Sequence, residues 1–320
     1  MKKIISLILV SVLILGLAAC GGEGSGTRMT MGTGSTSGTY YAFGGVLAQY
    51  IQNNGGVSVT PVSTDGSKAN ISYIATGDYH LGFTQSDVLA YAWEGTRSFA
   101  ELGAITSIRV IGGLYAEAVQ LVTMDPSIQS VADLAGKNVS IGAPGSGVYF
   151  NAIDILAAAG LTEDDINPQY QSFGDSTDAL KDGKIDAAFI VAGAPTAAIT
   201  ELCTTNEAFL VPIDGEIAAA LMEANSFYTP YTIPAGTYAG QDSDVVTVTV
   251  KATLIVSANA SEEDVYNITK AIFDNVDAIA AENGKGAELS IENATTGMSA
   301  PFHPGAARYF AEQGVTVYTE

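Results

Sequence analysis

Two stretches rich in glycine and hydroxyl residues have the composition of anion-binding loops. Residues 31–41 read MGTGSTSGTYY and residues 141–150 read IGAPGSGVYF, and apolar residues at helical spacing follow each of them. The first N–H groups of a helix have no partner within it, and the helix dipole adds positive charge there. Small residues also allow a ligand to approach this backbone closely. Each loop is therefore suited to a carboxylate, a phosphate or a similar oxyanion, without a cationic side chain.

The spacing in these loops differs from that of the better-known motifs that bind phosphate or supply a nucleophile. Ser37 stands where a dinucleotide-binding loop has its third glycine, and neither loop has the lysine of a P-loop. Ser146 lacks the flanking glycines of a nucleophile elbow. His80 and His303 are far apart in the sequence and give little support to a metal site or a catalytic triad. We expect no metal, no cofactor and no catalysis; the simpler alternative is that both loops are plain turns that cap helices.

Further polar groups follow three predicted strands. They lie in residues 63–70 (STDGSKAN), 84–87 (TQSD) and 191–196 (VAGAPT). In α/β sheets, ligands bind at the carboxyl ends of strands. Each segment alone could be a helix cap, but the three together indicate one ligand site.

Short strands alternate with helices along the chain, which predicts an α/β fold with helices on the faces of a sheet. The strongest strand pattern covers residues 244–258, residues 110–123 suggest two short strands with a bend, and residues 262–281 suggest one long helix capped by Ser261. About 300 mature residues exceed the usual size of a single core, so we expect two lobes. We expect the chain to pass from one lobe to the other near residues 114–117 and to return near residues 238–244, which would leave a cleft between the lobes.

The first twenty residues have the pattern of a lipoprotein signal peptide. Lys2 and Lys3 precede an apolar run from Ile4 to Leu15, and LAAC ends at Cys20. This lipobox pattern predicts lipidation of Cys20 and attachment of an extracytoplasmic protein to the membrane; an ordinary secretory peptide or a plain membrane helix are the alternatives. Residues 21–28 would be a flexible tether. Cys203 then has no disulfide partner and is expected to pack within a helix.

The charge balance excludes one class of partner. The chain has 34 acidic and 13 basic residues, and removal of Lys2 and Lys3 changes the formal net charge from −21 to −23. A surface of this sign repels phosphate backbones, so we do not expect a nucleic-acid partner.

The motifs together resemble the TAXI family, the extracytoplasmic solute receptors of one class of TRAP transporters. The resemblance runs from residue 29 to about residue 315 and rests on the segments GTGSTSGTYY, TDGSKANI, LGFTQSD, LYAEAVQLV, ADLAGKNVSIGAPGSG, GKIDAAFIVAGAPT and TIPAGTYAGQDSDVVTVTVKATL. It implies a two-lobed periplasmic-binding-protein type II fold with the ligand cleft between the lobes. It also implies capture of glutamate or a related amino acid or dicarboxylate, and delivery to a TRAP membrane permease. Lobe 1 would comprise residues 29–115 and 242–320, and lobe 2 residues 116–241.

The resemblance also assigns ligand-binding roles to residues of this sequence. Val148 departs from the hydroxyl residue that the family often has after GSG, which affects the identity of the ligand more than the general function. The implied ligand-binding residues, to which we add Glu117 at the predicted crossover, are Gly34, Ser35, Thr36, Thr39, Tyr40, Thr64, Ser67, Asn70, Gln85, Ser86, Asp87, Gly145, Ser146, Gly147, Pro195 and Tyr238.

Glu117 and the scarcity of cations bear on the charge of the solute. Glu117 could meet an ammonium group or form a contact between the lobes, and Lys68 is the only cation inside a candidate loop. This favours an amino-acid zwitterion over a free dicarboxylate. The rival functions are an exported α/β enzyme, which would need a nucleophile–base pair or a phosphate-binding lysine, and a ligand-sensing surface lipoprotein.

Overall fold

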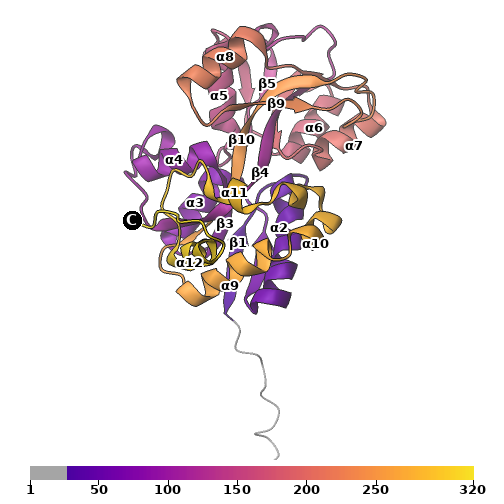
Figure 1. Cartoon of the computed structure of the whole chain (residues 1–320). Helices are drawn as coiled ribbons and strands as arrows, with labels where there is room; N and C mark the ends of the chain where they lie inside the picture. Colours follow the sequence, from indigo (N-terminus) through magenta and orange to yellow (C-terminus); the bar gives the residue numbers. More distant parts are fainter. Residues whose placement is uncertain (1–26) are drawn as a thin grey trace, which may run out of the picture.

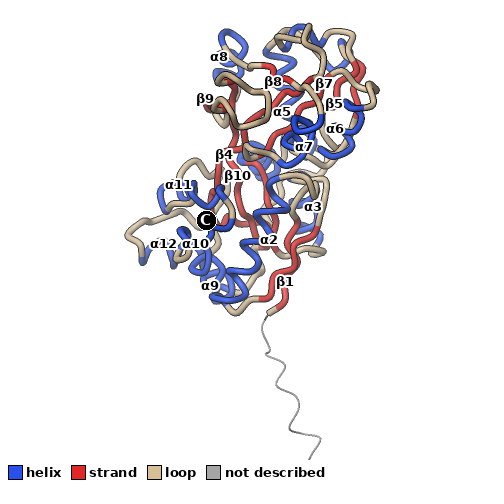
Figure 2. Tube along the Cα trace, turned by 90° about the vertical axis from the view of Figure 1, so that its right-hand side faces the viewer, coloured by secondary structure: helices blue, strands red, loops and turns tan. Residues whose placement is uncertain are grey.

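Two long antiparallel strands connect the two lobes of the molecule. The computed structural model describes residues 27–320; the predicted signal peptide, Cys20 and most of the predicted tether lie outside this range. Strands β4 (Ile108–Thr123) and β10 (Val245–Ser257) run from one lobe into the other, as both views show (Figures 1 and 2). The predicted strand at 244–258 is confirmed. Residues 110–123 are not two short strands, because β4 pairs along its whole length with strands of both lobes.

All strands formed by residues 27–320 belong to one ten-stranded sheet, in which eight follow the order β2-β1-β3-β10-β4-β7-β5-β6 and β8 and β9 pair beside this path. In lobe 1, three parallel strands lie beside β10; they are β1 (Arg28–Gly32), β2 (Ser58–Val62) and β3 (Leu81–Gln85). In lobe 2, β4 pairs with β7 and β8, and β10 pairs with β9. The strands of lobe 2 are β5 (Asn138–Ser140), β6 (Asn167–Gln169), β7 (Ala187–Ala192), β8 (Phe209–Val211) and β9 (Thr229–Ile233).

Helices follow most strands and cover the sheet in both lobes (Figure 1). Those of lobe 1 are α2 (Thr39–Tyr50), α3 (Ser67–Thr76), α4 (Ser86–Glu94), α9 (Glu262–Phe273), α10 (Val276–Glu282), α11 (Ile291–Thr295) and α12 (Pro304–Glu312). Those of lobe 2 are α5 (Val148–Ala158), α6 (Phe173–Lys181), α7 (Ala197–Thr205) and α8 (Gly215–Ala224). None of the helices formed by residues 27–320 has the length and apolar character needed to cross a membrane.

Each lobe has its own apolar core, and the chain changes core within the two long strands. Tyr115 belongs to the core of lobe 1 and Ala118 to lobe 2, so the first crossing lies at the predicted place. On the return, Val250 still packs in lobe 2, whereas Ala252 packs in lobe 1. This crossing is later than the predicted 241/242, because β10 pairs with β9 of lobe 2 before it reaches β3 of lobe 1.

The pairing of β4 with β10 is irregular at the point where the cores change. The register shifts between Lys251 and Thr253 and again between Leu254 and Ile255. The N–H of Ala116 donates there to the Glu288 carboxylate at 2.7 Å. Irregularities of this kind bend strands and increase their twist. This short segment is therefore the natural hinge between the lobes.

The predicted helix at 262–281 is two helices. Ser261 caps α9 as expected, by accepting a hydrogen bond from the N–H of Asp264. The helix ends because Asn275 leaves the helical conformation, with φ −120° and ψ 23°, while its side-chain amide donates to the carbonyl of Ala271. The break lets α10 pack against α2 and against the short helix Gly284–Glu288, which in turn contacts β4.

Two adjacent glycines of α2 give a matched test of how this helix packs on the sheet. A Cβ at Gly44 would lie 2.9 Å from the Thr33 methyl group and 3.2 Å from the Phe83 ring, whereas a Cβ at Gly45 would meet nothing within 4 Å. Gly44→Ala should lower the free energy of unfolding by about 1–3 kcal/mol. Gly45→Ala should raise it by about 0.5–1 kcal/mol, since alanine favours helix. Urea denaturation of both variants measures these changes, and equal stabilities would contradict the packing.

Candidate ligand-binding site

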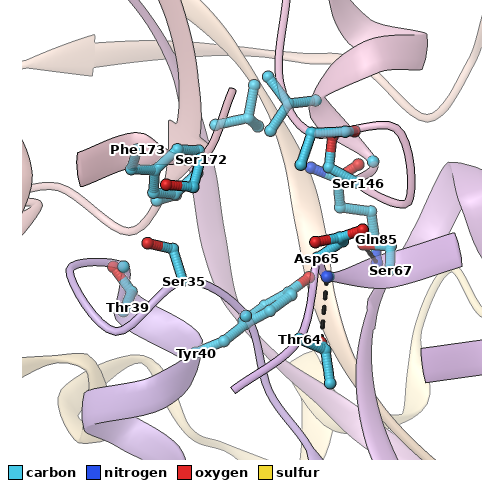
Figure 3. A pocket seen from close by; sticks show the side chains of 18 of the residues that line it. Ser35, Thr39, Tyr40, Thr64, Asp65, Ser67, Gln85, Ser146, Ser172 and Phe173 are labelled. Carbon is cyan, nitrogen blue, oxygen red and sulfur yellow. Dashed lines mark hydrogen bonds between the residues drawn. The ribbon is translucent and has the colours of Figure 1, made fainter. Parts of the chain in front are cut away.

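The two glycine-rich loops meet across one cavity between the lobes (Figure 3). The cavity holds about 550 Å³ of atom-free space, including its open mouth. Ten of the residues predicted for ligand binding line it: Gly34, Ser35, Thr39, Tyr40, Thr64, Ser67, Gln85, Glu117, Ser146 and Gly147.

Three helices begin at this cavity with a glycine as N-cap. Gly38 precedes α2, Gly66 precedes α3 and Gly147 precedes α5, and none of the three has a side chain that caps the helix. All three glycines line the cavity, two from lobe 1 and one from lobe 2. Two of these first-turn donors are already used, because the N–H of Ala69 donates to the Gly145 carbonyl and that of Tyr149 to Ser146 Oγ. The remaining donors are left for another acceptor. This arrangement suits a carboxylate bound from both lobes at once.

The floor of the cavity contains a buried acid. Glu117 is 2 % exposed, and its Oε2 accepts a hydrogen bond from the Tyr40 hydroxyl at 3.1 Å. Burial raises the pKa of Glu117 to about 8, although hydrogen bonds from Tyr40 and Gln85 oppose the shift. Tyr40 is held by the stacking of its ring on Phe83, with 4.8 Å between the centroids. At neutral pH the Glu117 carboxyl can therefore donate a hydrogen bond or, by losing its proton, accept a cation.

The described residues that line the cavity include two acids and no lysine, arginine or histidine. Asp65 is the second acid, beside Ser67 on the rim (Figure 3). Lys68, the only cation in a candidate loop, is not part of the lining. The Lys285 ammonium lies outside the lining, pairs with Glu288 at 2.6 Å and acts on Glu117 only as a more distant positive charge. The lining side chains thus contribute negative charge, and the positive potential within the lining comes from the helix ends.

The lobes also touch directly around the cavity. The N–H of Ala69 donates to the carbonyl of Gly145 at 3.0 Å, and the N–H of Ala198 to that of Ser37 at 3.1 Å. The Thr39 hydroxyl donates to the carbonyl of Gly193 at 2.9 Å. Gly145, predicted as a ligand contact, therefore lies outside the lining because its carbonyl is engaged with the opposite lobe.

Three other predicted residues of lobe 1 also lie outside the lining. Thr36 is exposed at the tip of its loop. Asn70 is fully buried, and its amide donates to the carbonyls of Thr33 and Phe83, so it holds the sheet instead. Asp87 is also fully buried, where it accepts a hydrogen bond from Asn151 of lobe 2.

Ser86 lines a different hollow, on the other face of the hinge strands. Its Oγ accepts a hydrogen bond from the N–H of Lys251. This rear hollow has about 1280 Å³ of open space and is also lined by Ala116, Phe227 and Glu288. Successive residues of a strand point to opposite faces, so Ala116 lines this rear hollow while Glu117 lines the front cavity.

The last two predicted residues, Pro195 and Tyr238, support lobe 2. Pro195 follows a cis peptide bond and lines a third hollow behind the start of α2. Tyr238 is buried; its hydroxyl accepts from the N–H of Thr196 and donates to Gln120. Tyr238 thus fixes the turn before α7 and does not face the cavity.

Sequence reasoning missed part of the lining, which comes mainly from lobe 2. Phe173 covers Gly38 from the opposite lobe, since a Cβ on that glycine would lie 3.1 Å from the Phe173 ring. Gln171 is buried at its Oε1 atom with no hydrogen-bond partner among the described residues. Ser172 caps α6, and this Ser-x-x-Asp pattern was a usable sign of a further strand–loop–helix turn. The other missed residues are Gly38, Asp65, Gly66, Ala143, Val148, Val191 and Ala192.

The model of the NMT1-like family matches residues 31–314 of the chain. Three solved structures have a similar fold. A protein from Bordetella bronchiseptica RB50 shares 16% identity, with a TM-score of 0.55 over 89% of each chain. The zinc-bound ligand-binding component of an ABC-type import system from Staphylococcus aureus shares 9%, with a TM-score of 0.51 over 90% of this chain and 92% of that one. A putative L-cystine ABC transporter from Listeria monocytogenes shares 16%, with a TM-score of 0.50 over 82% and 98%. The predicted two-lobed binding-protein fold is thereby confirmed.

Gly147 offers a direct test of lobe contact at the cavity. A Cβ at this position would lie 1.9 Å from Gln85 Oε1, whereas a Cβ at Gly174, another glycine of lobe 2 that faces lobe 1, would meet only Ser37 Oγ at 3.6 Å. Gly147→Ala should therefore hold the lobes apart and increase the radius of gyration in small-angle scattering, while Gly174→Ala should leave it unchanged. A Gly147→Ala variant as compact as the wild type would contradict the close approach.

The raised pKa of Glu117 predicts how stability depends on pH. The folded protein keeps the Glu117 proton up to about pH 8, whereas the ordinary glutamate pKa of 4.5 applies once the chain unfolds. The free energy of unfolding should therefore fall as pH rises between these values. Asp87 contributes a similar decline that ends near pH 7. Urea denaturation should thus show a lower free energy of unfolding at pH 8 than at pH 7 in the wild type, and Glu117→Gln should abolish this difference. An equal difference in both proteins would argue against a buried, protonated Glu117.

Proposed function

The chain belongs to the NMT1-like family, and we propose that it is an extracytoplasmic solute-binding protein, which captures a small carboxylate-bearing solute and delivers it to a membrane transporter. The observation that carries this proposal is the cavity between the lobes, onto which both lobes direct helix starts with glycine N-caps. Two of the structures that share the fold come from ABC-type transport systems, and we propose the same general use here.

We further propose that the solute is an amino acid, with glutamate or a close relative as the leading candidate. The helix starts would receive the carboxylate. The ammonium group would lie toward Glu117, whose buried carboxyl gains a counter-charge when a cation approaches. A free dicarboxylate would bring two negative charges with no ammonium group to offset either of them, to a lining that already holds Asp65 and Glu117.

Capture would proceed by rotation of the lobes about the irregular segment of β4 and β10. The solute would bind one lobe first, and the other lobe would then add its loop and exclude water. The solute favours the closed form because it contacts helix ends of both lobes there. No bond is made or broken in this cycle. Ser146, just before α5, donates a hydrogen bond from its hydroxyl to the Ala143 carbonyl. No histidine or lysine of the lining could act as its base.

We also propose which type of membrane transporter receives the solute. The motif resemblance to the TAXI family supports delivery to a TRAP permease, which is driven by an ion gradient. Uptake in cells that produce both proteins should then stop when the ion gradient is collapsed. Dependence on an ATPase subunit would instead favour an ABC system. Lipid attachment through Cys20 is part of the same proposal and lies outside the described residues.

Calorimetric titration tests the proposed solute class. L-Glutamate should bind more tightly than 2-oxoglutarate, which has the same two carboxylates without the ammonium group. Glu117→Gln should weaken L-glutamate binding by about 10- to 100-fold, as expected for the loss of a hydrogen bond to a charged group. Asp242→Asn, which changes an exposed acid outside the cavity lining, is the charge control.

Two results would count against this reading. Tighter binding of 2-oxoglutarate would remove the role of the ammonium group, and absence of any bound amino acid or carboxylate would remove the solute class. Mass spectrometry of small molecules that co-purify with the protein gives an independent identification, because it does not depend on the ligands chosen for titration.

A further inference from the structure

A second contact between the lobes lies beside the cavity and contains a buried acid. Asp87, in the first turn of α4, belongs to lobe 1, and Asn151 of α5 belongs to lobe 2. The Asn151 amide donates both to Asp87 Oδ2 at 3.0 Å and to the Tyr228 hydroxyl at 2.8 Å. Asp87 and Asn151 are both fully buried. The two lobes thus share a closed polar cluster that does not form part of the cavity lining.

Charged and aromatic groups cover this cluster on its outer side. Arg97, in the short helix Arg97–Phe99 after α4, pairs with Asp154 of lobe 2 at 2.7 Å and lies over the ring of Tyr91. Asn225 of lobe 2 donates to the Tyr91 hydroxyl at 2.6 Å. These contacts exclude water from Asp87 only while α4 and α5 remain together.

The hydrogen bonding of Asp87 is incomplete. Its Oδ1 atom is buried and has no partner among the described residues, and the same holds for Oδ1 of Asn151. The nearby cation, Arg97, is already paired with Asp154. Burial accordingly raises the pKa of Asp87 to about 7; the N–H of Val88 opposes this shift, and the charge of Asp154 adds to it. An ionised Asp87 is therefore costly in this position, whereas a protonated one is tolerated.

We propose that this cluster is a proton-linked latch, in which closure of the lobes takes up a proton on Asp87 and acid favours the closed molecule. Separation of α4 from α5 would expose Asp87 to water and remove the hydrogen bond to Asn151. An exposed aspartate is ionised above about pH 4. The proposal rests on the hinge motion described above and is independent of which solute the protein binds.

The sign and range of the effect follow from the groups that face Asp87. These are Asp154 and Tyr228 from lobe 2, Tyr91 on its own helix, Glu117 across β4, and Arg97. The closed form binds the additional proton, so closure should weaken as pH rises from about 4 to about 7 and should not change further above that. Glu117 acts in the same direction and extends to about pH 8. It must therefore be removed before Asp87 can be observed alone.

The test uses small-angle scattering of the protein without ligand in a Glu117→Gln background. The radius of gyration should increase between pH 5 and pH 7.5, because Asp87 loses its proton and the lobes separate. In the double variant Glu117→Gln/Asp87→Asn, this increase should be lost and the protein should stay compact at both pH values. Glu117→Gln/Asp242→Asn controls for the general loss of one acid and should behave as the Glu117→Gln background.

A second variant covers the case in which Asp87→Asn fails to fold, which circular dichroism would reveal. Asn151→Ala removes the amide that donates to Asp87 across the lobe contact, so at pH 5, where the Glu117→Gln background is compact, it should be more open than that background. Addition of L-glutamate to the wild-type protein at pH 7.5 reports hinge closure separately, because Glu117→Gln is itself expected to weaken glutamate binding. A radius of gyration that decreases with glutamate but not with acid would overturn the latch and leave the proposed function intact. The latch would also be overturned if the change of this radius with pH persisted in the Asp87→Asn variant, or if Asn151→Ala had no effect on it.

Discussion

The pairing of β4 with β10 is the constraint on which the rest of the structure depends. Both strands belong to the sheets of both lobes, so the lobes cannot separate without breaking this ladder or bending it. The irregular register beside Lys251 and Thr253 provides the bend within a continuous hydrogen-bonded pair. Because the crossing is made of two strands rather than a loose linker, the loops that face each other across the cavity keep a defined relation as the angle between the lobes changes.

Under the function proposed above, a protein with many acids binds an anion without a cationic side chain in the cavity lining. Its positive potential comes from backbone groups at three helix starts, which cannot be titrated and need no lysine or arginine. The titratable groups beside them, Glu117 and Asp87, are buried acids whose protons are held to unusually high pH. Charge recognition at the helix ends and proton binding at the lobe contact are thus separate properties of the same closed form.

The two glycine-rich loops could be predicted from the sequence as parts of one site, because the backbone donors at the start of a helix depend only on nearby residues. Small residues before an amphipathic run predict free N–H groups whatever the surroundings, and Gly34, Ser35, Ser146 and Gly147 do line one cavity. The residues that were misplaced, Asn70 and Asp87, have side chains that could bind a solute equally well. Only the fold decides that Asn70 bonds to two strand carbonyls and that Asp87 faces Asn151. Phe173 was missed for the same reason, since its approach to Gly38 depends on the opposite lobe.

The rear hollow lies on the face of the hinge strands opposite the front cavity and is lined by both lobes. It is lined by Phe227 from one lobe and by Glu288 from the other, and Glu288 also accepts the hydrogen bond of Ala116 at the bend. Because the hinge strands lie between the front cavity and the rear hollow, the proposed rotation would widen the rear opening as it narrows the front mouth. Anything that wedges into the back, or props it apart, would alter the aperture at the front without touching the captured molecule.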